Sequence, residues 1–119
     1  MTKNIIVRKT LVLTCAALLV TGAAAHAFTD FFRASSVLAF HTDTWRVWTS
    51  AGDHRVVVRG DGDTDLDCYV YDRFGNLLDA DTDGTDFCVI DIYNPSSGNL
   101  TIRVLNLGSV YNEYTLRVR

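Results

Sequence analysis

The sequence predicts an all-β fold, a small antiparallel β-sandwich of the jelly-roll kind, that follows a cleaved signal peptide. Three observations lead to this prediction. Short runs of alternating or β-branched residues follow one another to the C-terminus, turn residues separate these runs, and no segment of the mature chain has the 3.6-residue period of a long helix. Six such runs in about 90 residues are typical of a single two-sheet domain.

The first 27 residues have the pattern of a secretory signal peptide. A basic start without an acidic residue precedes an apolar run over 11–25, and Ala25-His26-Ala27 provides the small residues of a cleavage site. Cleavage before Phe28 leaves 92 residues, in the periplasm or outside the cell. The apolar run is shorter than the roughly 20 residues of a membrane-spanning helix, so we expect no stable membrane anchor after cleavage.

Between the leader and the first strand we expect a phenylalanine- and serine-rich entry segment over 28–39, and we place the sandwich domain at 40–119. Within that domain, clusters of glycine, asparagine, aspartate and serine separate the alternating runs, because these residues tolerate turn conformations. The expected strands lie at 45–49, 54–59, 66–72, 87–93, 100–105 and 114–118.

The alternation also assigns the faces of the strands, since neighbouring side chains point to opposite sides. Cys68 shares a face with Leu66 and Val70, and Cys88 shares one with Ile90 and Ile92. Each cysteine therefore lies on the aliphatic side of its strand. The other residues expected to face inward are Leu100, Ile102, Val104, Tyr114, Leu116 and Val118.

Two cysteines remain after cleavage, Cys68 and Cys88. Because the chain is directed to an oxidising compartment, we predict a single disulfide between them, with two free buried thiols as the alternative. A bridge that closes a loop of about 20 residues contributes roughly 3 kcal/mol in the chain-entropy model. In a domain this small such a contribution is a large part of the total stability.

The charge of the mature chain restricts its partners. The leader holds three of the eleven Lys and Arg residues and none of the fourteen acids, so eight basic residues against fourteen acidic ones give a net charge of −6. No lysine remains in the mature chain. Nucleic acid is therefore excluded as a partner class. Such a surface keeps a small secreted protein soluble and attracts hard cations.

One tryptophan and two tyrosines form a candidate contact surface. Trp45 and Trp48 are three residues apart, so they point to opposite faces of a strand, and one belongs to the core. Trp48, Tyr69 and Tyr71 are candidates for stacking on a sugar or contacting a protein. The alternative is that these rings only cover the second face of the sandwich.

A series of short motifs runs through residues 40–119 in a characteristic order and spacing. They are Trp45-Arg46-Val47, Ala51-Gly52, Asp63-Thr64-Asp65-Leu66-Asp67, Gly75-Asn76-Leu77, Leu100-Thr101-Ile102 and Asn106-x-Gly108. With these motifs the segment resembles the bacterial pre-peptidase C-terminal (PPC) domain. This resemblance implies a secreted β-sandwich with a non-catalytic accessory role, binding an extracellular protein or a polysaccharide or assisting an attached enzyme.

Aspartates recur at every second position over 61–67 and again over 79–83. Calcium takes six to eight oxygen ligands, and we hypothesise a loop-borne Ca²⁺ site formed by Asp61, Asp63, Asp81 and Asp83. A helix-loop-helix calcium loop is excluded because Leu66 stands where that loop needs glycine. The alternative is that the aspartates form turns and solvated strand edges.

Catalysis has little support in the sequence. The mature chain has two histidines, His41 and His54, and it contains no nucleophile elbow, metal-binding histidine pair or phosphate loop. We therefore predict no enzyme, no catalytic residue and a binding or accessory module. The alternative functions are a small secreted hydrolase and a protease-associated inhibitor or chaperone domain.

Overall fold

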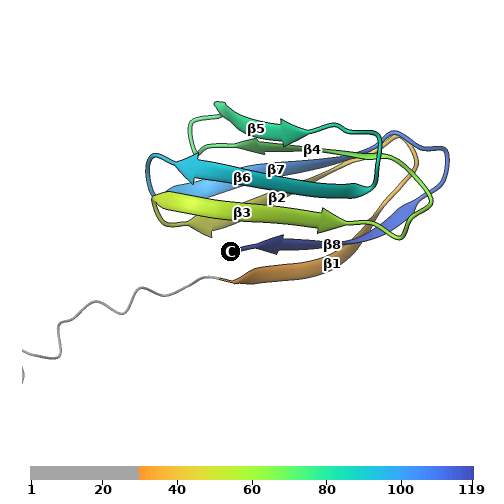
Figure 1. Cartoon of the computed structure of the whole chain (residues 1–119), viewed down its shortest axis with the longest axis horizontal. Helices are drawn as coiled ribbons and strands as arrows, with labels where there is room; N and C mark the ends of the chain where they lie inside the picture. The colour runs from red at the N-terminus through yellow and green to blue at the C-terminus, as the bar shows by residue number, and fades with distance from the viewer. Residues whose placement is uncertain (1–29) are drawn as a thin grey trace, which may run out of the picture.

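The computed structural model describes residues 30–119, and the predicted signal peptide lies outside them. The described residues form eight strands and no helix (Figure 1). These residues therefore contain no helix that is long and apolar enough to cross a membrane. The strands are β1 (Phe31–Val37), β2 (Thr42–Thr49), β3 (Gly52–Arg59), β4 (Leu66–Tyr71), β5 (Leu77–Asp81), β6 (Phe87–Asn94), β7 (Gly98–Asn106) and β8 (Asn112–Val118).

The eight strands form two antiparallel sheets, with the orders β1-β8-β3-β6 and β2-β7-β4-β5. We call them sheet A and sheet B. The chain changes sheet at each connection except the tight β4–β5 hairpin, so strands that are adjacent in a sheet are distant in sequence. Two sheets of four strands in this order form a jelly roll, which confirms the predicted fold class.

The core lies between the sheets and consists almost entirely of aliphatic side chains. Alternation along each strand puts one face of every central strand in this core, as in the buried-intermediate pattern of β4. The residues predicted to face inward are all buried: Leu66, Val70, Ile90, Ile92, Leu100, Ile102, Val104, Tyr114, Leu116 and Val118.

The predicted disulfide is present and joins the two sheets. Cys68 lies on β4 of sheet B and Cys88 on β6 of sheet A, with their Cα atoms 6.3 Å apart. Both cysteines are fully buried among the core residues. The bridge therefore fixes the spacing of the sheets on the side where β5 and β6 are the edge strands.

The edge strands β1 and β5 were missing from the sequence prediction. β1 pairs with β8 over its full length, from Phe31 opposite Val118 to Val37 opposite Asn112. The sandwich thus begins inside the segment 28–39 that we expected to precede it. As an edge strand, β1 buries few side chains, and only Val37 is fully buried. Its sequence therefore lacks a clear alternation of apolar and polar residues.

A polar network also connects the sheets, on the opposite side from the disulfide. The Trp45 indole N–H donates to the Tyr114 hydroxyl at 2.7 Å, and this hydroxyl donates to Asp43 Oδ2 at 2.6 Å. The Ser35 hydroxyl donates to the same carboxylate oxygen at 3.4 Å. Burial and the hydrogen bond to Asp43 raise the pKa of the Tyr114 hydroxyl well above its ordinary value.

Replacing Tyr114 by phenylalanine tests this network through its pH dependence. A tyrosine of the unfolded chain ionises near pH 10, whereas Tyr114 holds its proton to higher pH in the folded state. The stabilisation of the folded state by this protonated hydroxyl is therefore complete below about pH 10. It is lost as the pH rises from there toward the raised pKa. Tyr114→Phe is expected to lower the free energy of unfolding at pH 7 by about 1–3 kcal/mol.

Urea denaturation at pH 8 and at about pH 11 measures both effects. The wild-type protein is expected to lose more stability over this interval than Tyr114→Phe, since the two proteins differ only in this hydroxyl. Equal losses in the two proteins would contradict the assignment of the network to Tyr114.

Candidate functional site

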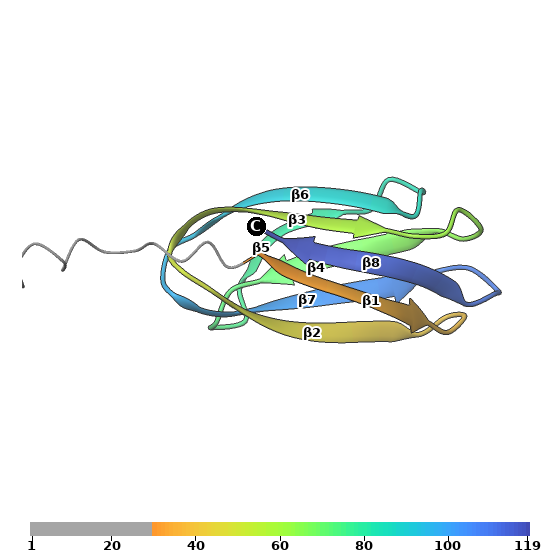
Figure 2. The same ribbon diagram turned by 90° about the horizontal axis from the view of Figure 1, so that it is seen from below.

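Four connections meet at one end of the sandwich, and we call this surface the loop end (Figure 2). The strand register requires the arrangement, because β1 ends opposite the start of β8 and β7 ends opposite the start of β4. The two described chain ends, Asp30 and Arg119, lie at the other end of the sandwich. The loop end comprises residues 38–41, 60–65, 82–86 and 107–111.

Asn106 fastens two of these loops together. It is the last residue of β7 and is fully buried. Its side-chain amide donates to the carbonyl oxygens of Val37 and Val110, at 3.2 and 2.7 Å. Its main-chain N–H donates to the His41 carbonyl at 2.9 Å. The β1–β2 loop and the β7–β8 loop therefore have a common anchor.

Asn112 fastens the β3–β4 loop and the β5–β6 loop together. It is the first residue of β8 and is completely buried. Its amide donates to Thr64 Oγ1 at 2.7 Å and to Asp86 Oδ2 at 3.3 Å, while its side-chain oxygen accepts the Asp61 N–H at 3.2 Å. The Gly62 N–H donates to the same oxygen of Asp86. This arrangement holds the β3–β4 loop against the β5–β6 loop.

Close packing joins the two pairs of loops. The Leu107 N–H donates to the Asp65 carbonyl at 2.9 Å. A Cβ atom at Gly108 would lie 2.6 Å from the Thr64 side chain, so only glycine lets the β7–β8 loop approach the β3–β4 loop this closely. All four loops thus form one connected surface.

The loop end displays apolar side chains to solvent. Five of its residues are between 47% and 73% exposed, all of them from the β1–β2 and β7–β8 loops: Leu38, Phe40, Leu107, Val110 and Tyr111. Sequence reasoning missed this cluster, because each of its members lies outside the strands expected from the sequence. The signal was a group of large apolar residues at turn positions, where polar residues are usual.

Phe40 is the most exposed of these residues at 73%, and its φ angle is +59°. That value lies in the left-handed region, which costs an L-residue with a bulky side chain roughly 1–2 kcal/mol. The Leu38 carbonyl accepts the His41 N–H at 3.1 Å and closes the tight turn that holds this conformation. The chain therefore keeps an aromatic ring at the tip of a strained turn.

Two of the predicted calcium ligands lie together in the β3–β4 loop. The hydrogen bond between their carboxyl groups lowers the pKa of Asp61 and raises the pKa of Asp63. Asp61 also accepts the Glu113 N–H at 3.0 Å. The negative charge of Asp86 raises the pKa of Asp63 further.

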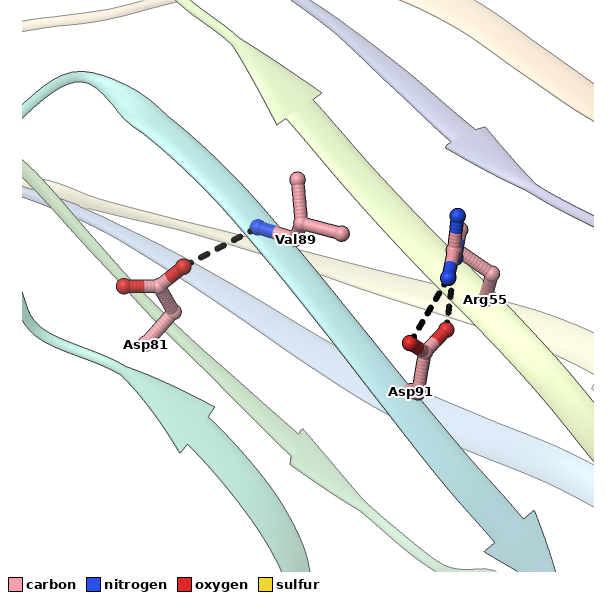
Figure 3. Close-up of polar contacts among 4 residues, drawn as sticks. All are labelled: Arg55, Asp81, Val89 and Asp91. Carbon is pink, nitrogen blue, oxygen red and sulfur yellow. Dashed lines mark hydrogen bonds and ion pairs between the residues drawn. The ribbon is translucent and has the colours of Figure 1, made fainter.

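The other two predicted ligands have separate partners. Asp81 closes β5 and accepts the Val89 N–H of edge strand β6 at 3.0 Å (Figure 3). Asp83 accepts the main-chain N–H and the hydroxyl of Thr85, at 2.9 and 2.8 Å. Burial, followed by the charges of neighbouring aspartates that include Asp81 and Asp83, raises the pKa of Asp67.

The structure does not bring the four predicted calcium ligands together as one group. Across residues 30–119, no three side chains of histidine, cysteine, aspartate or glutamate are grouped so that they could hold a metal ion. Asp30, at the start of the domain, is paired with Arg117 at 2.6 Å. Calcium binding stays a prediction. Melting curves with excess calcium and with excess chelator test it, since a ligand of the folded state raises Tm.

The predicted aromatic surface lies on the outer face of sheet B. Trp48 is 56% exposed, while Tyr69 and Tyr71 are half-buried. Trp45 packs against the core, which confirms that the two tryptophans point to opposite faces. β7 lies between β2 and β4, with Arg103 opposite Tyr69. The three aromatic residues therefore share a face without forming one continuous patch.

The outer face of sheet A combines exposed apolar side chains of β6, namely Phe87, Val89 and Tyr93, with arginines that have partners. Arg55 and Asp91 form a bidentate ion pair at 2.6 and 2.8 Å (Figure 3). The guanidinium of Arg59 lies 5.1 Å from the centre of the Phe87 ring. Because the ion pair is exposed, its contribution to stability is small.

Both histidines of the described chain contact main-chain oxygens. His41 Nδ1 lies 2.7 Å from the Ala39 carbonyl, and His54 Nε2 lies 2.8 Å from the Ser50 carbonyl. Asp43, the nearest acidic residue to His41 in sequence, is bonded to Tyr114 instead. Neither histidine is therefore arranged as a base beside a hydroxyl nucleophile.

The fold is similar to that of two kinds of known protein. The pre-peptidase C-terminal domain of a collagenase from Bacillus anthracis has a TM-score of 0.63 and 15% identity, over 76% of this chain and 89% of that one. The periplasmic inhibitor of g-type lysozyme PliG from Aeromonas hydrophila has a TM-score of 0.58 and 17% identity, over 80% and 89%. A mutant of the Escherichia coli PliG has a TM-score of 0.51 and 14% identity, over 81% of this chain and 91% of that one.

No family model matches the sequence, and no curated protein matches it either. At identities of 14–17% the likeness to solved structures concerns the fold alone. It agrees with the resemblance that the sequence motifs carry over residues 40–119. The chain has the fold of a pre-peptidase C-terminal domain.

Proposed function

We propose that this protein is a secreted, non-catalytic module that binds another protein outside the cytoplasm. The loop end carries this proposal, because it exposes five large apolar side chains on loops that two buried asparagines hold in place. Exposed apolar clusters with polar surroundings mark protein-contact sites. Loops that are ordered before binding lose less conformational entropy in the complex.

Two further observations support an extracytoplasmic protein partner. The disulfide between Cys68 and Cys88 is typical of proteins in oxidising compartments. Similar structures include periplasmic inhibitors of g-type lysozyme, so this fold serves protein binding elsewhere. A lysozyme of the g type is accordingly the first partner we propose to test.

The experiment adds the oxidised mature protein, residues 28–119, to a purified g-type lysozyme and measures binding by calorimetry and the rate of peptidoglycan lysis. We expect saturable binding and slower lysis. Phe40→Ser is expected to weaken both effects, whereas Phe74→Ser, with a ring of similar exposure at the opposite end of the sandwich, leaves them unchanged. Absence of binding rejects lysozyme as the partner, and turnover of a glycan or peptide by the protein itself contradicts a non-catalytic role.

A polysaccharide is the second candidate ligand, because Trp48 stands 56% exposed on the outer face of sheet B. Exposed aromatic rings stack on the apolar faces of sugars. Affinity electrophoresis in gels that contain polysaccharide separates this candidate from the first. If the polysaccharide slows the migration of the wild-type protein and of Phe40→Ser but not of Trp48→Ala, sugar binding is assigned to sheet B.

A further inference from the structure

We infer that the loop end docks into a recessed, positively charged site of its protein partner, with Phe40 as the central apolar anchor. This inference rests on the proposed protein-binding function and names the surface and the kind of partner. Its evidence is the charge of the four loops, the projection of their apolar tips and the conformation of Phe40.

The charges of the described chain are strongly segregated. The four loops contain five aspartates and no lysine or arginine. All eight arginines of residues 30–119 lie outside these loops. One of them, Arg59, ends β3 directly before the β3–β4 loop and has its guanidinium over the Phe87 ring. Outside the loop end, Arg55 forms an ion pair with Asp91, and Arg117 forms one with Asp30. A positively charged partner is therefore attracted to the loop end, and a negatively charged one is repelled.

The apolar side chains decide the shape of the partner site. The loops project beyond the ends of the strands (Figure 2), and Phe40 lies at the tip of its turn with 73% of its surface exposed. A projecting ring loses the most water when it enters a pocket, and aromatic anchors of this kind dominate interface energies. The aspartates of the neighbouring loops then form the polar rim of the contact.

A second copy of the same chain fits this surface poorly. The mature chain carries a net charge of −6, so two copies repel each other. Self-association is one outcome of the test below, and it would replace the partner that we name.

The strain at Phe40 gives a first test. Glycine adopts a φ of +59° without the steric cost of a side chain. Phe40→Gly is therefore expected to raise Tm by about 2–6 °C while it removes partner binding. Phe74→Gly is the matched control, since Phe74 has no positive φ, and it is expected to lower Tm or leave it unchanged. A fall in Tm for Phe40→Gly would show that the ring stabilises the fold and would overturn its role as an anchor.

The second test places the photoreactive residue p-benzoylphenylalanine at position 40, 74 or 48, one at a time, in the oxidised mature protein. Each protein is irradiated with the periplasmic and extracellular proteins of the producing cells, and cross-linked partners are identified by mass spectrometry. The expected result is a cross-link from position 40, and none from position 74 or 48, to a protein with a net positive charge.

Charge variants complete this test. Asp63→Asn combined with Asp83→Asn keeps the acceptor oxygens of both side chains and is expected to lower the cross-link yield at position 40 at least about tenfold at low salt. Asp53→Asn combined with Asp79→Asn removes the same charge outside the loop end and is expected to leave the yield unchanged.

The outcomes separate the inference from the proposed function. Cross-links from position 74 or 48 alone would keep protein binding and overturn the loop end as its surface. A cross-link from position 40 to an acidic protein, to a second copy of the chain, or with a yield that ignores the charge variants would overturn the positively charged partner. Absence of cross-links from all three positions would overturn the proposed function itself.

Discussion

Reduction of the Cys68–Cys88 bridge is expected to lower the free energy of unfolding by about 3 kcal/mol, because the open chain regains the entropy of a loop with a sequence separation of 20 residues. The loss is large for a domain of this size, whose total stability is of the order of 5–10 kcal/mol. The bridge also joins sheet A to sheet B, so the reduced protein loses its covalent link across the core.

Urea denaturation with and without reductant measures this loss. The double variant Cys68→Ala with Cys88→Ala provides the control, since it is expected to resemble the reduced protein and to be insensitive to reductant. A change of less than about 1 kcal/mol on reduction would show that aliphatic packing alone holds the sheets together.

Asn112→Ala is expected to lower the free energy of unfolding by about 2–4 kcal/mol. The side chain is completely buried and connects Thr64, Asp86 and the Asp61 main chain. Alanine removes the hydrogen bonds that Asn112 makes to the Asp61 N–H and the Thr64 hydroxyl, and it leaves Asp86 Oδ2 with the Gly62 N–H alone. The β3–β4 and β5–β6 loops are expected to separate, and binding at the loop end is expected to weaken even at temperatures where the variant is folded.

Asn99→Ala is the matched control, because Asn99 is exposed on the outer face of β7. Its effect is expected to stay within about 0.5 kcal/mol. Hydrogen exchange of the amides in residues 60–65 and 82–86 reports the separation of the loops directly. Unchanged protection of both segments in Asn112→Ala would contradict the anchoring role that we assign to this side chain.

Much of the fold could be predicted from alternation. A buried strand shows its inner face as every second residue, so the inward positions around Cys68 and Cys88 followed from the sequence and so did the plausibility of their bridge. Opposite placement of Trp45 and Trp48 followed from the same period. The edge strands β1 and β5 escaped prediction, because each buries only part of one face and pairs with a distant strand or across a tight hairpin.

The candidate site was predicted less well. The acidic positions were recognised as conspicuous, and the contact of Asp83 with the Thr85 N–H two residues on agrees with the alternative that aspartates form turns. The bond between the Asp61 N–H and Asn112 joins residues 51 apart, so no local pattern reveals it. The sequence placed Asn106 in a turn and gave neither Asn106 nor Asn112 a structural role. Their roles depend on hydrogen bonds across 69 residues to Val37 and across 51 residues to Asp61.

The sequence by itself determined the two-sheet architecture, the inner faces of the central strands and the disulfide, because these depend on a local period of two and on the pairing of two cysteines. Only the tertiary structure decided which loops meet. The jelly-roll strand order brings 38–41 beside 107–111 and 60–65 beside 82–86. The exposed cluster around Phe40 arises from this long-range pairing, which no short window of sequence contains.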